Sequence, residues 1–354
     1  MENNERTRVL LTEHFKTYPE MQIQDVFKFI YQSSFGCEHL VSSLEKVTEY
    51  LIQEYNTLQI GKDIRIEKLD GNYSRVYLSY LNNGISIDTF GKLFFLSAKK
   101  EEGGLAALED KLKVANQMVR EGILPFAIEE FESAIKEWKN KGFPAIHHSD
   151  TFRQKYKPAY RLIANEYIPF LPLFAELDKR LSDGSVTLAV EGGSASGKTT
   201  LSSLLQKIYN CTVFHMDDFF LQPHQRTAER FAEVGGNVDR ERFEEEVLQP
   251  LKRREVINYR RFNCQNMQIE EGVQILPQKL TVIEGAYSMH TEFEGFYDYS
   301  VFLDIDELLQ RKRIEKRNTP QLAKRFFDEW IPLEKIYFEK SNVAGRCDLQ
   351  IKIV

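Results

Sequence analysis

The chain has 354 residues, of which 42% are hydrophobic and 28% charged, and its formal net charge at pH 7 is −6. This length and composition are typical of soluble globular proteins with two domains of ordinary size, and they disfavour extended disorder. The acidic balance argues against nucleic acid and anionic membranes as default partners and favours a small-molecule partner.

The absence of a targeting signal and the cysteine pattern indicate the expected cellular location. No apolar run approaches the length that spans a bilayer, and the segment MENNERTRVLLTEHF is charged where a secretion signal carries an apolar core. The four cysteines lie far apart and form no CxxC pair, which predicts reduced thiols instead of a disulfide framework or a zinc knuckle. We therefore expect a cytoplasmic protein, and the sequence leaves its oligomeric state open.

The first half of the chain is predicted to be mainly α-helical. Apolar residues recur three and four positions apart over residues 21–35, 38–55, 105–119 and 126–140. Between these runs, residues 64–81 alternate around Asp70-Gly71-Asn72, which predicts a β-hairpin. A helical run over 167–181 ends at Ser182-Asp183-Gly184, where turn chemistry predicts a boundary. We therefore expect an N-terminal domain over residues 1–183 and a second domain over 184–354.

Two polar segments of the first half could form a site. Cys37 and His39 lie in SSFGCEHL, and His147 and His148 lie in AIHHSDTFRQKYKPAYR. Zinc accepts histidine, thiol and carboxylate ligands, and the cations that follow HHSD could bind a phosphorylated ligand. Because no secure metal-ligand spacing is present, zinc binding, anion binding and a purely structural role all remain open, and the N-terminal domain has no assigned role.

From residue 185 onward, strand-like runs alternate with helical ones. The strand-like runs are SVTLAV, CTVFHM, KLTVIEG and YSVFLDID, and the helical runs include TLSSLLQKIY and ELLQRKRIEKR. This alternation predicts an α/β domain with a mostly parallel sheet and helices on both faces. In such sheets ligands bind at the carboxyl ends of the strands.

Residues 192–199, GGSASGKT, match the phosphate-loop pattern GxxxxGK[ST] in full. Its glycines let successive backbone N–H groups point at phosphate oxygens, and the start of the following helix adds its positive dipole end. Lys198 is predicted to reach the β- and γ-phosphates, and Thr199 to place its hydroxyl on Mg²⁺. The predicted nucleotide-binding residues are Gly192, Gly193, Ser194, Ala195, Ser196, Gly197, Lys198, Thr199 and Thr200.

A phosphate loop alone does not separate kinases from GTPases, transporter ATPases and motors. No NKxD segment that could read guanine follows the loop, and no LSGGQ-like stretch marks a transporter ATPase. The segment CTVFHMDDFFLQP instead places Asp217 and Asp218 at the end of the next strand-like run. An acid at that point can accept the proton of a hydroxyl that attacks the γ-phosphate, which favours a kinase.

These segments resemble the uridine kinase and phosphoribulokinase group of P-loop kinases over roughly residues 185–354. GGSASGKTT is similar to the uridine kinase loop nearly letter for letter, and HMDDFF resembles the segment whose first Asp is the family's general base. The resemblance implies that Asp217 is the general base with Asp218 in support, that ATP is the phosphate donor, and that Mg²⁺ is the cofactor. The P-loop NTPase fold is implied with it.

Three further segments extend the resemblance. NVDRERF resembles the segment whose Asp holds sugar hydroxyls, which implies that role for Asp239, although a helix N-cap or a solvated charge is the alternative. TVIEG resembles the strand whose last Glu approaches the metal, which implies Glu284. LDIDELLQRKRIEKRN resembles the lid, with Arg313 and Arg317 at the lid-arginine positions on one helix side; a solvated basic face is the alternative.

The chain departs from uridine kinases around the acceptor. Phe220 stands where they carry the Tyr of DSFY, and NYRRFNCQ stands where they carry a Tyr-Asp pair and a nearby His. Tyr259 and Phe262 in that segment could stack on a base or belong to the core. The N-terminal segments resemble segments joined to uridine kinase-like domains in bacterial proteins without an assigned role, which favours treating both halves as one functional unit.

These observations predict an ATP-dependent small-molecule kinase that phosphorylates a hydroxyl of a nucleoside or a similar sugar-containing acceptor. One alternative is a nucleotide-gated regulatory protein, in which ATP occupancy controls what the N-terminal domain binds. Another is a metal enzyme fused to a nucleotide-binding domain. The sequence leaves open the identity of the acceptor and whether ATP is preferred over other nucleoside triphosphates.

Overall fold

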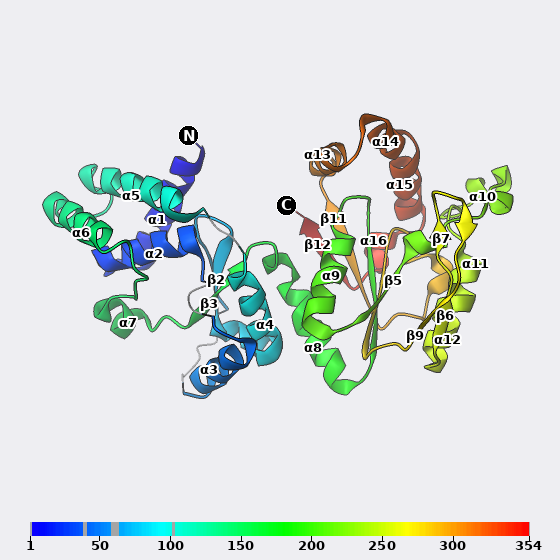
Figure 1. Cartoon of the computed structure of the whole chain (residues 1–354), viewed down its shortest axis with the longest axis horizontal. Helices are drawn as coiled ribbons and strands as arrows, with labels where there is room; N and C mark the ends of the chain where they lie inside the picture. Colours follow the sequence, from blue (N-terminus) through cyan, green and yellow to red (C-terminus); the bar gives the residue numbers. More distant parts are fainter. Residues whose placement is uncertain (1, 38–40, 58–63, 101–102, 354) are drawn as a thin grey trace. The chain divides into compact units, whose positions relative to one another are not determined.

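The computed structural model describes residues 2–37, 41–57, 64–100 and 103–353. Its internal contacts divide the chain into two compact units, Met1–Leu171 and Pro172–Val354. The division falls after Leu171, the first residue of helix α8 (Leu171–Asp183), whereas the sequence predicts a domain boundary after this helix. The elements of each unit are labelled in Figure 1.

The first unit combines helices with a small antiparallel sheet. Its helices are α1 (Glu2–Thr17), α2 (Ile23–Phe35), α3 (Leu44–Thr57), α4 (Ile87–Ala98), α5 (Gly104–Arg120), α6 (Ile128–Asn140) and α7 (Asp150–Tyr156). Strands β1 (Ile66–Lys68), β2 (Tyr73–Tyr77) and β3 (Tyr160–Ala164) pair in the order β1-β2-β3. The predicted hairpin is confirmed by the antiparallel pairing of β1 with β2, while strand β3 was not predicted.

Apolar periodicity located most of the helices of this unit. Helices α2, α5 and α6 lie within two residues of their predicted ranges at each end. Helix α3 begins at Leu44, six residues later than predicted, and residues 38–40 of the predicted run lie outside the described residues. Helices α1 and α4 were not predicted; α4 begins where the Ser86 side chain accepts a hydrogen bond from the Thr89 backbone N–H.

A network of buried polar groups lies within the first unit. The Arg75 side chain is fully buried, and its Nε and Nη2 atoms donate to Gln32 Oε1 at 3.0 and 2.7 Å. Glu67 lies 3.5 Å from Arg75 Nη1 and also bonds to His14. Because a buried charge is tolerated only when it is paired and hydrogen-bonded, these contacts account for the burial of Arg75.

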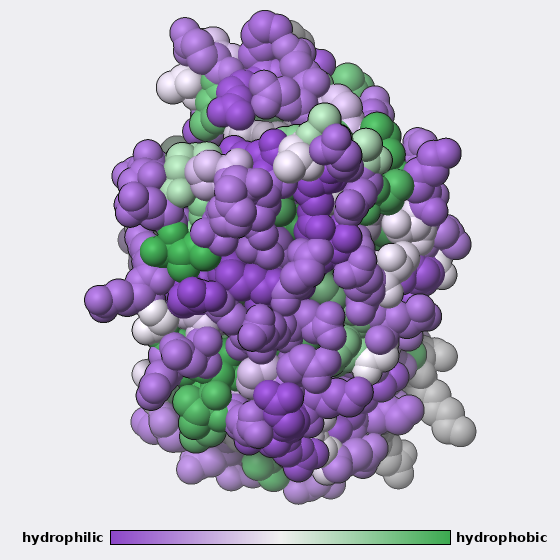
Figure 2. Space-filling view, turned by 90° about the vertical axis from the view of Figure 1, so that its right-hand side faces the viewer, coloured by the Kyte–Doolittle hydropathy of each residue, from purple (hydrophilic) through white to green (hydrophobic). Residues whose placement is uncertain are grey.

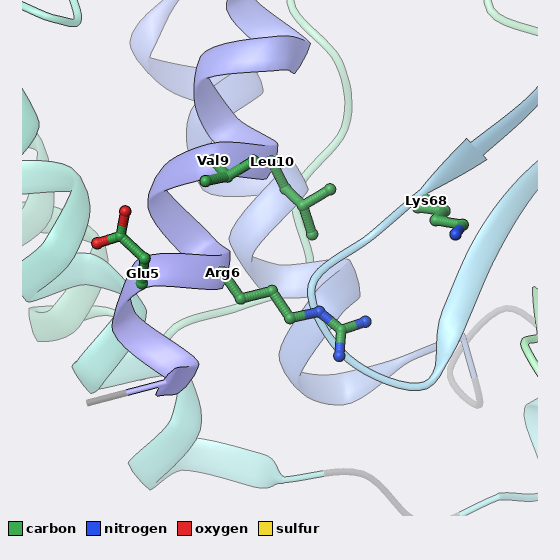
Figure 3. A pocket seen from close by; sticks show the side chains of 5 residues that line it. All are labelled: Glu5, Arg6, Val9, Leu10 and Lys68. Carbon is green, nitrogen blue, oxygen red and sulfur yellow. The ribbon is translucent and has the colours of Figure 1, made fainter. Parts of the chain in front are cut away.

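The first unit also has a surface pocket between α1 and β1. It is lined by Glu5, Arg6, Val9, Leu10 and Lys68. Figure 3 shows that the Glu5 carboxylate and the Arg6 guanidinium point in different directions, so the charged groups do not converge on one point. None of the residues predicted from the sequence as a functional site lines this pocket.

The second unit is built on a five-stranded parallel sheet with the strand order β12-β11-β4-β10-β5. The strands are β4 (Val186–Gly192), β5 (Thr212–His215), β10 (Leu280–Glu284), β11 (Tyr299–Ile305) and β12 (Leu349–Ile353). All four neighbouring pairs are parallel. The four predicted strands and their parallel pairing are confirmed, and β12 adds an unpredicted strand at one end of the order.

Helices and short elements connect these strands. The helices are α9 (Lys198–Tyr209), α10 (Ala228–Ala232), α11 (Arg240–Phe243), α12 (Gln249–Arg253), α13 (Glu307–Arg317), α14 (Pro320–Arg325), α15 (Ile331–Lys340) and α16 (Val343–Arg346). A 3-10 turn, η4 (Met216–Phe219), follows β5 directly. Two π-helical segments, η6 (Glu244–Leu248) and η8 (Phe326–Trp330), join α11 to α12 and α14 to α15. Short strands β6 (Ile257–Tyr259) and β9 (Val273–Ile275) pair separately, as do β7 (Phe262–Asn263) and β8 (Gln268–Ile269).

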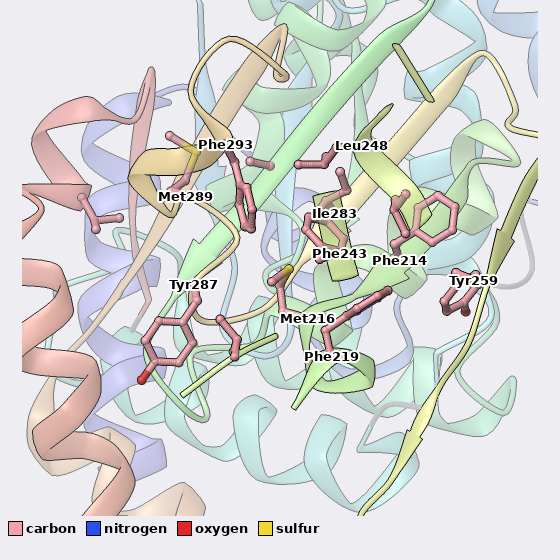
Figure 4. Close-up of a cluster of buried hydrophobic side chains, with 14 of the residues drawn as sticks. Phe214, Met216, Phe219, Phe243, Leu248, Tyr259, Ile283, Tyr287, Met289 and Phe293 are labelled. Atoms are coloured by element: carbon pink, nitrogen blue, oxygen red, sulfur yellow. The ribbon is translucent and has the colours of Figure 1, made fainter. Parts of the chain in front are cut away.

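A buried hydrophobic cluster fixes η4 beside the end of β5. Met216 and Phe219, at the two ends of η4, are 1% and 0% exposed and belong to this cluster with Phe214 and Phe243. Figure 4 shows these side chains together with Tyr259 and Ile283. Because Met216 and Phe219 are anchored, the intervening residues 217 and 218 are held at the carboxyl end of β5.

The surface shows no large apolar patch in the view of Figure 2, where hydrophobic residues are scattered over a mainly hydrophilic face. The exposed large hydrophobic residues of the second unit include Phe231, Val273 and Leu276. Among the residues that the structure describes, no helix combines the length and apolar character needed to cross a membrane.

Candidate functional site

The phosphate loop joins β4 to α9 in the arrangement that its motif requires. Gly192 has φ 149° and Gly197 has φ 99°, and a Cβ atom on Gly192 would lie only 2.7 Å from the Leu303 carbonyl oxygen. Glycine is therefore required at residue 192 on both conformational and steric grounds. Ala195 also adopts a positive φ of 61°, a conformation that residues with a Cβ atom adopt rarely.

Lys198 and Thr199 open helix α9. The Lys198 ammonium donates to the carbonyl oxygens of Gly192 and Gly193 at 2.8 and 3.0 Å. The Thr199 hydroxyl donates to Glu284 Oε1 at 3.1 Å. The structure thus brings together Thr199 and Glu284, the two residues predicted to approach the metal, although they are 85 residues apart in sequence.

His215 also contacts Glu284, a contact that the sequence analysis did not identify. In the parallel pairing of β10 with β5, Glu284 lies opposite His215, and His215 Nδ1 is 2.6 Å from Glu284 Oε1. The hydrogen bond that His215 donates to the Glu284 carboxylate raises the pKa of His215. The position of His215 at the end of a strand-like run was the available signal, but its partner depended on the strand register.

Asp217 and Asp218 lie in η4 at the same edge of the sheet. Asp217 is solvent-exposed as a residue. Desolvation by the surrounding protein nevertheless raises the pKa of its carboxyl group, and the charge of Lys198 opposes this effect. Burial likewise raises the pKa of Asp218, whose Oδ2 lies 3.6 Å from Arg261 Nε. The charges of Lys198 and Glu284 act on Asp217 in opposite directions: Lys198 lowers the pKa of its carboxyl group and Glu284 raises it.

Asp239 occupies a structural position next to this site. It is 2% exposed and caps α11, accepting hydrogen bonds from Arg242 N at 3.3 Å and Arg242 Nε at 3.2 Å. Arg242 Nη2 in turn donates to the Asp218 carbonyl oxygen at 2.9 Å. The N-cap alternative weighed from the sequence therefore describes the bonds of Asp239 in this structure.

The two aromatic residues predicted to contact the acceptor lie in the core. Tyr259 is 0% exposed, and its ring centroid lies 5.2 Å from that of Phe214 and 6.0 Å from that of Phe219. Its hydroxyl lies 3.5 Å from Asp218 Oδ2, which ties the ring to the acidic pair. Phe262 is 5% exposed. Neither ring offers an open face for stacking on a base.

Helix α13 contacts the phosphate loop through one of its two predicted arginines. Arg313 Nη1 donates to the Ala195 carbonyl oxygen at 3.2 Å. Arg317 is exposed, and its guanidinium lies 5.8 Å from the centroid of the Phe326 ring. Gln310, which the sequence analysis did not identify, donates through Nε2 to the Ser194 carbonyl oxygen at 2.8 Å.

Two buried carboxylates beside the loop were also missed. Glu191 is fully buried and accepts hydrogen bonds from Gly192 N, Met289 N and the Tyr337 hydroxyl at 2.9, 3.0 and 3.0 Å; burial raises its pKa to about 7. Glu334, on α15, accepts from the backbone N–H and the hydroxyl of Ser194 at 2.9 and 2.6 Å. Glu191 directly precedes the motif, whereas no local pattern marks Glu334.

The polar segments of the first unit are engaged in internal hydrogen bonds. His148 Nδ1 bonds to Asp25 Oδ1 at 2.9 Å and Nε2 to the Tyr160 hydroxyl at 2.7 Å, and burial lowers the pKa of His148 to about 4. His39 lies outside the described residues. Within the described parts of the chain, no three or more His, Cys, Asp or Glu residues are grouped to hold a metal ion.

Comparisons with known proteins give distant likenesses. No protein-family model and no curated protein matches the chain. A solved structure described as a possible uridine kinase from Bacillus stearothermophilus is 22% identical, with 50% of this chain and 99% of the other covered and a TM-score of 0.38. Shikimate kinase from Bacteroides thetaiotaomicron is 17% identical, with coverage of 47% and 86% and a TM-score of 0.25.

A third solved structure, deoxyadenosine kinase from M. mycoides with bound dATP, is 16% identical, with coverage of 47% of this chain and 89% of the other and a TM-score of 0.23. With TM-scores below 0.5, these likenesses establish neither the fold nor the activity of this chain. What the chain does must therefore be inferred from its own residues.

Proposed function

We propose that the second unit is an ATP-dependent kinase that transfers the γ-phosphoryl group to a hydroxyl of a small molecule. The observation that supports this most is the convergence of three elements at the carboxyl edge of one parallel sheet. These are the phosphate loop with Lys198, the Thr199–Glu284 pair, and the exposed carboxylate of Asp217. A protein that only binds nucleotide has no need for an exposed acid beside the loop.

The proposed reaction is an in-line displacement. The acceptor oxygen attacks the γ-phosphorus, the bond between this phosphorus and the β–γ bridging oxygen breaks, and ADP leaves. Asp217 takes the proton of the acceptor hydroxyl, for which a carboxyl group with a raised pKa is better suited than an ordinary one. Lys198 would neutralise phosphate charge. Arg313, which follows Gln310 by three residues on α13 and contacts the loop at Ala195, would add a second cation.

Residues that could hold Mg²⁺ fit the requirements of this ion. The Thr199 hydroxyl and the Glu284 carboxylate are hard oxygen donors placed 3.1 Å apart. Bound there, Mg²⁺ would supply charge neutralisation of the phosphate oxygens. Glu284 would then act as a metal ligand directly or through water, and His215 would orient its carboxylate.

The acceptor is the open part of this proposal. The Asp239 carboxylate accepts hydrogen bonds from the backbone and side chain of Arg242, and Tyr259 and Phe262 are buried. The residues that favoured a nucleoside acceptor thus have other contacts in this structure. We therefore propose a small-molecule alcohol as the acceptor class, with nucleosides and sugar alcohols to be tested side by side.

The kinase activity is tested by measuring ADP release from Mg²⁺ATP with and without a panel of nucleosides and sugar alcohols. We expect at least one acceptor to accelerate ADP release, with a phosphorylated product in equal amount. Slow ADP release that no acceptor changes would contradict a kinase and indicate a nucleotide-gated protein. A Lys198→Ala variant controls for contaminating ATPases, because it removes the loop cation.

Replacing Glu284 by glutamine is expected to raise the Mg²⁺ concentration that gives half-maximal activity by about 10- to 100-fold. Glutamine keeps the acceptor oxygen for Thr199 and His215 but lacks the negative charge that attracts the ion. The rate of ADP release is measured against free Mg²⁺ at saturating ATP. The exposed Glu255→Gln variant is the matched control, and an unchanged Mg²⁺ requirement in Glu284→Gln would exclude Glu284 as a ligand.

A further inference from the structure

The tip of the phosphate loop is held from outside by helices α13 and α15. Gln310 and Arg313, on α13, donate to the carbonyl oxygens of Ser194 and Ala195. Glu334, on α15, instead accepts hydrogen bonds from Ser194. Gln310 and Arg313 therefore occupy acceptor groups of the loop, whereas Glu334 occupies donor groups.

Glu334 binds both donors that Ser194 offers. Its Oε2 accepts the Ser194 backbone N–H at 2.9 Å and its Oε1 accepts the Ser194 hydroxyl at 2.6 Å. Backbone N–H groups and hydroxyls of such a loop are the donors that phosphoryl oxygens use. A carboxylate with two oxygens and a negative charge satisfies the same donors as a phosphoryl group.

The charges around Glu334 support this comparison. Glu334 is 6% exposed, and no salt bridge to it is present within the described residues. Burial raises the pKa of Glu334, and the charge of Lys198 opposes this effect. Asp217 acts on it with the opposite sign. The charge of Glu334 is thus influenced by the same lysine that the proposed function assigns to nucleotide phosphate.

Helix α15 itself is anchored next to the loop by a second side chain. Tyr337, three residues after Glu334, donates its hydroxyl to Glu191, which also holds Gly192 N. Release of the Glu334 side chain would therefore leave α15 attached through Tyr337. The contact of Glu334 with Ser194 can open without unfolding the helix.

We propose that Glu334 is a carboxylate latch that competes with nucleotide phosphate for Ser194 and for the charge of Lys198, and that nucleotide binding displaces it. The latch lowers nucleotide affinity and couples occupancy of the loop to the freedom of the Glu334 side chain on α15. This inference rests on the proposed function only in that the loop binds nucleotide. The opposite role, a support that prepares Ser194 for phosphate, predicts the opposite change in affinity.

The test compares the dissociation constants of ATP, ADP and adenosine for the wild-type protein and Glu334→Gln by isothermal titration calorimetry. Glutamine keeps the side-chain length and one acceptor oxygen but removes the charge. We expect Glu334→Gln to bind ATP about tenfold more tightly, ADP with a smaller gain, and adenosine unchanged. Glu339→Gln, at an exposed residue of the same helix, is the control and should leave all three constants unchanged.

The outcomes separate the latch from the proposed function. If the wild-type protein binds no ATP, the proposed function fails. If it binds ATP and Glu334→Gln binds no more tightly, or gains equally for adenosine, the latch is overturned while nucleotide binding stands. Thermal unfolding by circular dichroism checks that the variant is folded. Should Glu334→Gln not fold, Glu334→Met, which is similar in size and also uncharged, provides the same comparison.

Discussion

Replacing Asp217 by asparagine is expected to lower turnover by about 10²- to 10⁴-fold while ATP affinity stays nearly unchanged. Asparagine has the size of aspartate but cannot accept the proton of the acceptor hydroxyl. Asp217 is exposed within η4, between the anchoring residues Met216 and Phe219, so we expect the substitution to leave the fold intact. Turnover is measured as acceptor-dependent ADP release, and ATP affinity by titration calorimetry.

The pH dependence of the rate provides an independent check on Asp217. A general base must be ionised, so the rate falls as the pH is lowered through its pKa. Because the protein raises the pKa of Asp217, this fall begins at a higher pH than for an ordinary aspartate, and the residual activity of Asp217→Asn should lack it.

Asp218→Asn is the matched control for Asp217→Asn. The Asp218 carboxylate lies next to Arg261 and the Tyr259 hydroxyl, and we do not assign it the role of proton acceptor. We therefore expect Asp218→Asn to lower turnover less than Asp217→Asn does. Equal turnover in Asp217→Asn and the wild-type protein would remove Asp217 from the chemical step. Loss of ATP binding in Asp217→Asn would assign it to nucleotide binding instead.

Replacing Arg75 by methionine is expected to lower the free energy of unfolding of the first unit by about 3–5 kcal/mol. Arg75 is fully buried, bonds twice to Gln32 and lies 4.8 Å from the Tyr160 ring centroid. Its removal leaves the Glu67 carboxylate without its nearest guanidinium. A buried charge that loses its partner costs more than the pair itself contributes.

The two tryptophans of the chain allow this effect to be measured unit by unit. Trp138 lies in α6 of the first unit and Trp330 in η8 of the second. In a Trp330→Phe background, urea unfolding followed by tryptophan fluorescence reports on the first unit alone. The control is Arg153→Met, an exposed arginine of α7, which should change the free energy by less than about 0.5 kcal/mol. Similar midpoints for both variants would contradict a stabilising role of Arg75.

Local signals in the sequence predicted the parts of the site that depend on neighbouring residues. The strand, loop and helix around Gly192 and Lys198 follow from one contiguous motif. Glu284 was implied by the resemblance of TVIEG, and its contact with Thr199 agrees with the rule that parallel strands end at the same edge of a sheet. The hairpin of β1 and β2 likewise depended on a short turn.

The remaining parts depend on contacts between distant segments. Glu334 and Ser194 are 140 residues apart, and nothing near Glu334 in the sequence distinguishes it from a solvated glutamate of a charged helix. The sequence around Tyr259 is compatible both with stacking on a base and with packing against Phe214, and only the fold places Tyr259 in the core. Arg75 lies in a short strand between Ser74 and Val76, and nothing in that segment of the sequence indicated its burial.

The order of the parallel sheet divides the site into two mechanically different halves. Strand β4, which carries the phosphate loop, is paired on both sides, with β11 and β10, whereas β5, which carries η4 and Asp217, is paired only with β10. A strand with two hydrogen-bonded neighbours resists displacement more than an edge strand. If the second unit is the proposed kinase, the strand behind the nucleotide phosphates is thus held on both sides, whereas the strand behind Asp217 is held on one side and by the core contacts of η4.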